Sequence, residues 1–321
     1  PAFVRAFHLV GHDWGAIVAQ AAAAAARAQP DLRVLSLVSV AIQSAYRSSA
    51  KISELNNVRQ VGNALLMYAG SNDDRLVRGW QSTEVQALTE KTIVYPDFVE
   101  IPPAPTFRHS DENIAGPWTW HLVPYLDSAD SIMRSHLDRE DQKLVHYVDQ
   151  GYEFAHEPAF AYNGWYLGGQ WDFWDPHFPS PQLRFASVEQ LDGSFVSPVV
   201  RTIPHVKNST EVVAFCSAFK ADGPMSGPLD SEFVKGTWLV EPRLLANEMQ
   251  WGIDEAGALH IHDETHAPLG RDGGPPVAWF IDGHADTQSF EDLADQRRWI
   301  DRARPVGDQL ARDWTHEDDV R

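Results

Sequence analysis

The chain has 321 residues, of which 43% are apolar and 22% are charged, which is typical of a globular protein with one large domain or two small ones. Its formal net charge of −19 argues against nucleic acid as a partner, because a phosphate backbone must be neutralised by Lys and Arg side chains. Twelve Trp and 21 Pro indicate a loop-rich body packed with aromatic side chains. No run of 18 uninterrupted apolar residues appears, so the sequence predicts no transmembrane helix.

Residues 1–35 form an atypical N-terminal segment that reads as a short strand, a tight turn and an Ala-rich helix closed by Pro30. Residues 11–15, GHDWG, resemble the nucleophile elbow of α/β-hydrolases such as epoxide hydrolases and haloalkane dehalogenases. In those enzymes a strand–turn–helix exposes an aspartate nucleophile. One alternative for the function is therefore a hydrolase with Asp13 as the nucleophile and His284 as the base.

The next segment predicts a helix from about Ile42 to Ala69. Apolar side chains recur every three or four residues and would form one buried stripe. The stripe consists of Ile52, Leu55, Val58, Val61, Leu65 and Tyr68. Gly70 is expected to end the helix, because glycine readily adopts the left-handed conformation found at helix ends.

The rest of the chain predicts a strand-rich body. Residues 128–150 have the spacing of a second helix, whereas later apolar runs separated by Pro, Gly and Asp predict an antiparallel sheet. These runs are residues 195–201, 211–219, 236–240, 258–262 and 277–281. Cys216, the single cysteine, lies within one of them, which favours a buried and inert thiol over a nucleophile.

Five segments in order resemble the prepilin-like proteins of planctomycete and verrucomicrobial type, relatives of type II secretion pseudopilins and type IV pilins. The first is LNNVRQVGNALLMYA at residues 55–69, preceded at the family's spacing by residues 41–51. The others are WTWHLVPYL at 118–126, AYNGWYLGG at 161–169, VKNSTEVVAF at 206–215 and GGPPVAWFIDGH at 273–284. The last resembles the family's C-terminal H-x9-DG motif, although Asp272 stands where that motif has its histidine.

The resemblance implies an α+β, pilin-like fold in which a long N-terminal helix packs on an antiparallel sheet with elaborated loops. Its domains would be the N-terminal segment 1–35, the pilin-type helix 36–70 and a globular β-rich head 71–321. The expected function is structural rather than enzymatic: a pseudopilin-like subunit, or its soluble head, of a type II secretion or type IV pilus-like assembly. Its partners would be other pilin-like subunits and components of the assembly. The protein would be located in the cell envelope, on the periplasmic or extracellular side. Membrane anchoring, which the family has, is not evident in this chain.

A metal site is a further alternative. His260 and His262 would project to the same face of a strand, with a nearby carboxylate or His266 to complete a site. Asp282 and Asp286 flank the DGH sequence and would suit calcium or another divalent metal, but a tight turn also explains them, since Asp and Gly are the residues that turns favour. The resemblance adds weight to calcium, because some major pseudopilins carry a calcium site in a C-terminal loop.

The aromatic segment 162–174, YNGWYLGGQWDFW, leaves two interpretations open. It could form a surface on which a glycan stacks, or fill the core of a loop-rich domain. With the metal site, it makes an extracytoplasmic metal- or glycan-binding module the second alternative function.

Overall fold

In the computed structural model the described residues lie between positions 32 and 310, with gaps. They are 32–89, 93–94, 100–101, 116–126, 155–173, 177, 179–184, 188–189, 195–221, 225–226, 234–241, 251–253, 259–261, 266–270, 274–301, 305–306 and 309–310. The chain divides by its internal contacts into residues 1–54 and residues 55–321. The predicted helix at 128–150 and the segment before residue 32 lie outside the described residues.

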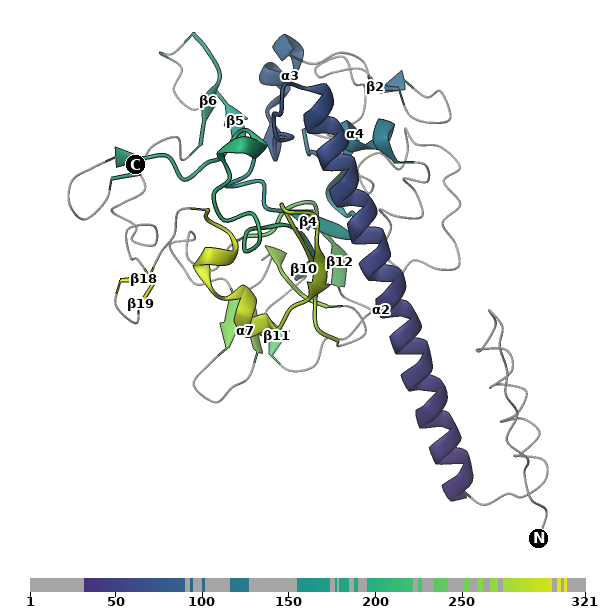
Figure 1. Ribbon diagram of the computed structural model, residues 1–321. Helices are drawn as coiled ribbons and strands as arrows, with labels where there is room; N and C mark the ends of the chain where they lie inside the picture. Colours follow the sequence, from purple (N-terminus) through teal and green to yellow (C-terminus); the bar gives the residue numbers. More distant parts are fainter. Residues whose placement is uncertain are drawn as a thin grey trace. The chain divides into compact units, whose positions relative to one another are not determined.

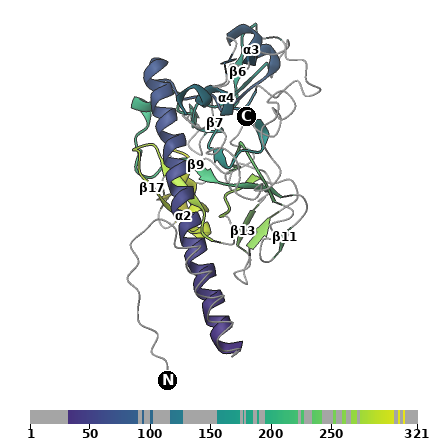
Figure 2. The ribbon, with the colours of Figure 1, turned by 90° about the vertical axis from the view of Figure 1, so that its right-hand side faces the viewer.

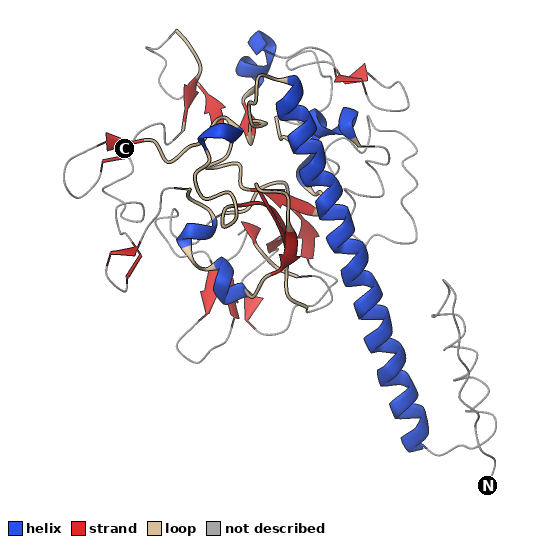
Figure 3. Cartoon of the chain, viewed as in Figure 1, coloured by secondary structure: helices blue, strands red, loops and turns tan. Residues whose placement is uncertain are grey.

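The described part is a mixed α+β protein whose longest element is helix α2, Leu32–Ser71 (Figures 1 and 3). The predicted helix is therefore present, and it begins before Ile42. Val58, Val61 and Leu65 are buried as predicted, whereas the prediction was wrong for Ile52, which is 61% exposed. No helix in the described part combines the length and the hydropathy that crossing a lipid bilayer would need.

The end of α2 differs from the prediction that Gly70 would supply a left-handed stop. Gly70 is still helical, and the left-handed residues are Asp73 and Asp74, with φ of 56° and 58°. Aspartate is among the side chains that tolerate this region, because its short polar group can bond to nearby backbone. The side-chain amide of Asn72 donates to the carbonyl of Tyr68 at 2.7 Å, which satisfies one of the free carbonyls of the last turn.

The central sheet has four antiparallel strands in the order β17-β16-β9-β4. Its strands β9 and β17 are labelled in Figure 2. Its strands are β4 Phe160–Tyr162, β9 Val213–Ser217, β16 Val277–Phe280 and β17 Ala285–Thr287. Every residue of β4, β9 and β16 is buried, so both faces of the sheet are covered. A bulge between Trp279 and Phe280 shifts the register against β9.

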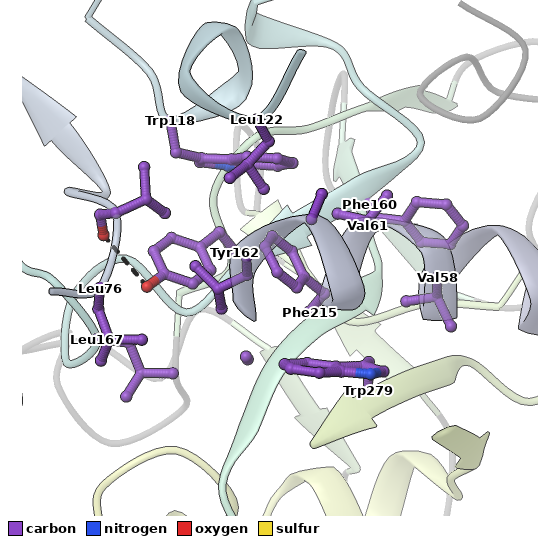
Figure 4. Close-up of a cluster of buried hydrophobic side chains, with 14 of the residues drawn as sticks. Val58, Val61, Leu76, Trp118, Leu122, Phe160, Tyr162, Leu167, Phe215 and Trp279 are labelled. Atoms are coloured by element: carbon purple, nitrogen blue, oxygen red, sulfur yellow. Dashed lines mark hydrogen bonds between the residues drawn. The ribbon is translucent and has the colours of Figure 1, made fainter. Parts of the chain in front are cut away.

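One face of this sheet forms the larger core, which also contains the buried apolar side chains of α2 from Val58 onward. Phe215 lies between two tryptophans, its ring centroid 4.9 Å from that of Trp118 and 6.2 Å from that of Trp279 (Figure 4). On the opposite face Cys216 and Phe280 pack with residues such as Trp299. Cys216 is fully buried, as predicted, and this burial raises the pKa of its thiol.

The remaining described elements are short. The strands are β1 Trp80–Gln81, β2 Ile93–Val94, β3 Glu100–Ile101, β5 Gln170–Asp172, β6 Gln182–Leu183, β7 Val188–Glu189, β8 Phe195–Val196, β10 Phe219–Ala221, β11 Met225–Ser226, β12 Val234–Gly236, β13 Trp251–Ile253, β14 Leu259–Ile261, β15 His266–Ala267, β18 Pro305–Val306 and β19 Gln309–Leu310. They pair as β1-β5-β6, β12-β10-β15 and β11-β14-β13 and as three two-stranded ribbons. The helices are α3 Thr83–Thr89, α4 Thr119–Leu122 and α7 Phe290–Leu293, with 3-10 turns η1 Val123–Tyr125, η2 Ile203–His205 and η5 Gln296–Arg298.

Candidate functional site

The DGH sequence forms the tight turn between β16 and β17. Gly283 has φ of +99°, which glycine adopts without the steric cost of a Cβ, and its N–H donates to the carbonyl of Phe280 at 2.9 Å. Asp282 Oδ1 accepts the backbone N–H of His284 at 3.1 Å and lies 2.6 Å from His284 Nδ1. The turn thus uses the aspartate as a local acceptor that orients the histidine ring.

This turn is also tied to its surroundings. The His284 ring stacks on Phe280, with centroids 4.2 Å apart and planes 5° from parallel. The guanidinium of Arg59 in α2 donates to the carbonyl of Ala285 at 3.2 Å. The backbone N–H of Asp282 donates to the carbonyl of Ser209 at 3.1 Å. The DGH turn and Ala285, the residue after it, therefore contact the helix, the central sheet and the loop before β9.

The predicted metal residues that the structure describes belong to two different sheets. Asp282 and Asp286 lie at the β16–β17 hairpin, and Asp286 Oδ1 accepts the N–H of Thr287 at 2.7 Å. His260 belongs to β14 in a different sheet, and His262 lies outside the described residues. Within the described ranges no group of three or more His, Cys, Asp or Glu side chains could hold a metal ion. The local hydrogen bonds of Asp282 and Asp286 are those of turn residues.

His266 is also in another sheet. It lies in β15, paired with β10, and its Nδ1 hydrogen-bonds with the hydroxyl of Thr237. The backbone N–H of His266 donates a hydrogen bond to Glu241 Oε2 at 3.3 Å. These contacts hold His266 against β12 and its following loop rather than at the DGH turn.

The residues of the hydrolase alternative are only partly described. Asp13 lies outside the described residues, and His284 Nδ1 contacts Asp282 in the turn. A nucleophile elbow of the hydrolase type follows a strand of a parallel sheet. The central sheet of the described part is antiparallel throughout.

Asn163, in the AYNGWYLGG segment, is a buried connection between distant parts of the chain. Its amide nitrogen donates to the carbonyl of Val213 at 3.0 Å and to that of Trp299 at 2.8 Å. It follows β4, which pairs with β9. A buried amide that bridges three segments in this way fixes their relative positions, because leaving its donors unpaired would cost about 1–3 kcal/mol.

Asp301 is a second buried connection, and sequence reasoning missed it. Its Oδ1 accepts the backbone N–H of Lys207 at 2.7 Å and that of Asn208 at 2.8 Å. The carbonyl of Asp301 accepts from the Asn208 amide at 2.5 Å. These partners are separated by 93 and 94 positions, so no local spacing in the sequence signals the contact.

The aromatic segment 162–174 divides between the core and the surface. Tyr162 and Tyr166 are fully buried, and burial raises the pKa of both phenols. The hydroxyl of Tyr162 donates to the carbonyl of Val77 at 3.2 Å. Trp171 is only half-buried and lines a cavity. The core interpretation therefore holds for the two tyrosines, and Trp171 is on a surface that a ligand can reach.

Helix α2 presents a polar stripe on the side opposite its buried residues. In the part from Leu55 onward the exposed positions recur every three or four residues, as one helix face does. They are Asn56, Arg59, Gln60, Asn63, Met67, Gly70 and Ser71. Met67 is the large apolar side chain of this stripe and is 56% exposed.

Comparisons with protein-family models, with curated proteins and with solved structures found no match to this chain.

Proposed function

We propose that the chain is a pseudopilin-like structural subunit of a type II secretion or type IV pilus-like assembly, with a pilin-like fold and a place in the cell envelope. One observation carries the proposal: the segments that resemble prepilin-like proteins pack together around one long helix. Residues of the 55–69, 118–126, 161–169, 206–215 and 273–284 segments all contribute side chains to the same core. If these separate segments resembled the prepilin-like proteins only by chance, nothing would require them to pack in one core.

The proposed contact between subunits is made by helix α2. Its first turns are rich in apolar residues, since residues 32–42 read LRVLSLVSVAI. Ile52, further along the helix, is 61% exposed in the single chain. An exposed apolar side chain on a long helix gains free energy when a neighbouring helix covers it, by about 25 cal/mol per Å² of apolar area removed from water. No catalytic group is part of this proposal.

Photo-crosslinking in the cells that produce the protein tests this assignment. A benzophenone amino acid at position 52 reports neighbours of the helix, and the same amino acid at position 88 is the matched control. Leu88 in α3 is 68% exposed, so both positions carry large exposed apolar side chains on helices. We expect the crosslinker at position 52 to give covalent multimers of the subunit, and the crosslinker at position 88 to leave the subunit monomeric.

Two results would count against the proposal. Monomer alone at position 52 would show that α2 has no subunit neighbour, and equal ladders at both positions would show non-specific association. As a second measurement, Ile52→Asp should remove the subunit from the multimeric fraction while Leu88→Asp leaves it there. The melting temperatures of the purified variants show whether either substitution acts through folding.

A further inference from the structure

A cavity of about 590 Å³ lies beside the end of helix α2, lined by residues from three separate segments. Arg75 and Arg78 come from the segment after the helix, and Trp171 comes from β5. Arg201, Thr202 and His205 come from the segment that leads into η2. A volume of this size matches the clefts that take small organic ligands.

Backbone hydrogen bonds hold the cavity walls in place without a ligand. The N–H of Leu76 donates to the carbonyl of Arg201 at 2.9 Å, and that of Gly168 donates to the carbonyl of Val200 at 2.8 Å. Gly168 has φ of +71°, and a Cβ there would overlap the carbonyl oxygen of Val77. The three segments approach one another so closely because position 168 has no side chain. A cavity whose backbone is pre-formed in this way lowers the ordering cost of binding a ligand.

The cavity is basic on a chain that is strongly acidic. Three arginines and a histidine line it, and none of the described lining residues is acidic, although the formal net charge of the chain is −19. Asp73 and Asp74 precede Arg75 but do not line the cavity. The side chains of Arg75 and Arg201 are exposed and form no ion pair in the described part of the chain. Arginine presents a planar fork of donors that matches carboxylate and sulfate groups.

The other lining groups add an aromatic ring and hydroxyl chemistry. Arg78 lies over the Trp171 ring, with its Cζ 5.1 Å from the centroid, and hydrogen-bonds to the Gln81 amide. The hydroxyl of Thr202 lies 2.6 Å from His205 Nδ1, which orients the histidine ring at the rim. Guanidinium groups, hydroxyls and an indole together suit a sugar ring that carries a negative charge.

We propose that this cavity binds a small acidic saccharide, a sugar of one or two rings carrying a carboxylate or sulfate group. Arg75 and Arg201 contact the anionic group, and Trp171 contacts the sugar ring. The net charge of −19 disfavours long polyanions, which the rest of the surface repels, so the ligand is short. This binding site is separate from the helix contacts proposed for assembly and does not depend on them.

Isothermal titration calorimetry with the full chain tests the proposal. The titrants are digalacturonate, glucose 6-sulfate, neutral cellobiose and inorganic sulfate. We expect at least one acidic sugar to bind at least tenfold more tightly than cellobiose and inorganic sulfate, and binding to weaken as salt screens the arginines. Failure of both acidic sugars to bind would overturn the proposal. Equal binding of inorganic sulfate would do so too, because it would indicate an unspecific anion site.

Variants separate the roles of the side chains. Arg75→Ala with Arg201→Ala should lower the affinity for the acidic sugar at least tenfold, and Trp171→Ala should lower it without changing the weak binding of sulfate. Arg184→Ala is the matched control, because Arg184 also lies over a tryptophan, 4.7 Å from the Trp165 centroid, but does not line the cavity. Loss of binding in the control as well, or retained binding in the double variant, would contradict the assignment. Tryptophan fluorescence gives a second readout on the folded protein. The acidic sugar should quench the emission of Trp171, which is the part of the signal that Trp171→Phe lacks.

Discussion

Trp279 occupies the space that a side chain at position 62 would need. A Cβ built on Gly62 would overlap the indole ring of Trp279, which is fully buried in the core beneath helix α2. At Gly70, in the last turn of the same helix, nothing lies within 4 Å of such a Cβ. The two glycines therefore have different roles, although they belong to one helix. Gly62 permits the close approach of helix and sheet.

We expect Gly62→Ala to destabilise the protein by about 1–3 kcal/mol, because the buried indole cannot move without disturbing the core. Gly70→Ala should leave the stability unchanged or slightly higher, since alanine favours helix over glycine by up to about 1 kcal/mol. Urea denaturation of both variants measures the free energy of unfolding. Equal stabilities of the two variants would contradict this description of the helix–sheet contact.

Asp295 and Arg297 form an ion pair with N–O distances down to 2.5 Å. Partial burial raises the pKa of Asp295, but the hydrogen bonds and charge of Arg297, with the charge of Arg298, outweigh it and leave this pKa below its usual value. A carboxyl group with a lowered native pKa stabilises the fold above its unfolded pKa. That contribution is lost as the pH falls through the native value.

Asp295→Asn should therefore lower the free energy of unfolding at pH 7 by less than about 1 kcal/mol, because the pair is partly exposed to solvent. The difference from the parent protein should shrink as the pH falls below about 3.9, the usual aspartate pKa. Denaturation curves across this pH range measure it. The exposed Glu291, changed to Gln, is the control, and a difference that grows toward low pH would have the wrong sign for this ion pair.

At the scale of elements, helix α7 begins with a capping box. The Ser289 hydroxyl oxygen accepts the N–H of Asp292 at 2.9 Å, and Asp292 Oδ2 accepts the N–H of Ser289 at 3.4 Å. The helix has four residues, so these contacts satisfy much of its free backbone. It precedes the buried Trp299, whose indole N–H donates to the carbonyl of Leu293 at 2.7 Å.

Ser289→Ala should cost about 0.5–2 kcal/mol of stability, because it removes the acceptor for the Asp292 N–H. Ser289→Thr keeps a hydroxyl at the same position and should retain most of the stability. Thermal unfolding compares the three proteins. If the alanine and threonine variants melt together, the capping contact does not stabilise this end of the fold.

Local patterns in the sequence anticipated part of these elements. The buried face of α2 at Val58, Val61 and Leu65 and the burial of Cys216 were predictable, because apolar spacing reports which side of an element meets the core. Ile52 was misplaced because the predicted stripe advanced in repeated steps of three residues. Nine residues are about two and a half helical turns, which puts Ile52 opposite Val61.

For the whole molecule, the contacts that sequence reasoning missed are those between distant segments. Asp301 Oδ1 accepts hydrogen bonds from the backbone at Lys207 and Asn208, and the basic cavity combines arginines at positions 75 and 201. No periodicity in the sequence predicts such pairs, because they depend on how segments that are far apart in the chain pack against each other. The turn at Asp282, in contrast, was predictable from local chemistry, since Asp and Gly adopt turn geometry wherever they occur.

The order of the segments along the chain has a consequence for how the protein is made. Arg59 in α2 is separated by 226 positions from Ala285, the residue whose carbonyl it contacts beside β16. At a synthesis rate of about 5–20 residues per second, these residues reach the ribosome exit roughly 10–45 s apart. Throughout that interval the apolar face of α2 has no strand β16 to cover it. The apolar face of the nascent helix is therefore a surface that a ribosome-associated chaperone can bind during this interval.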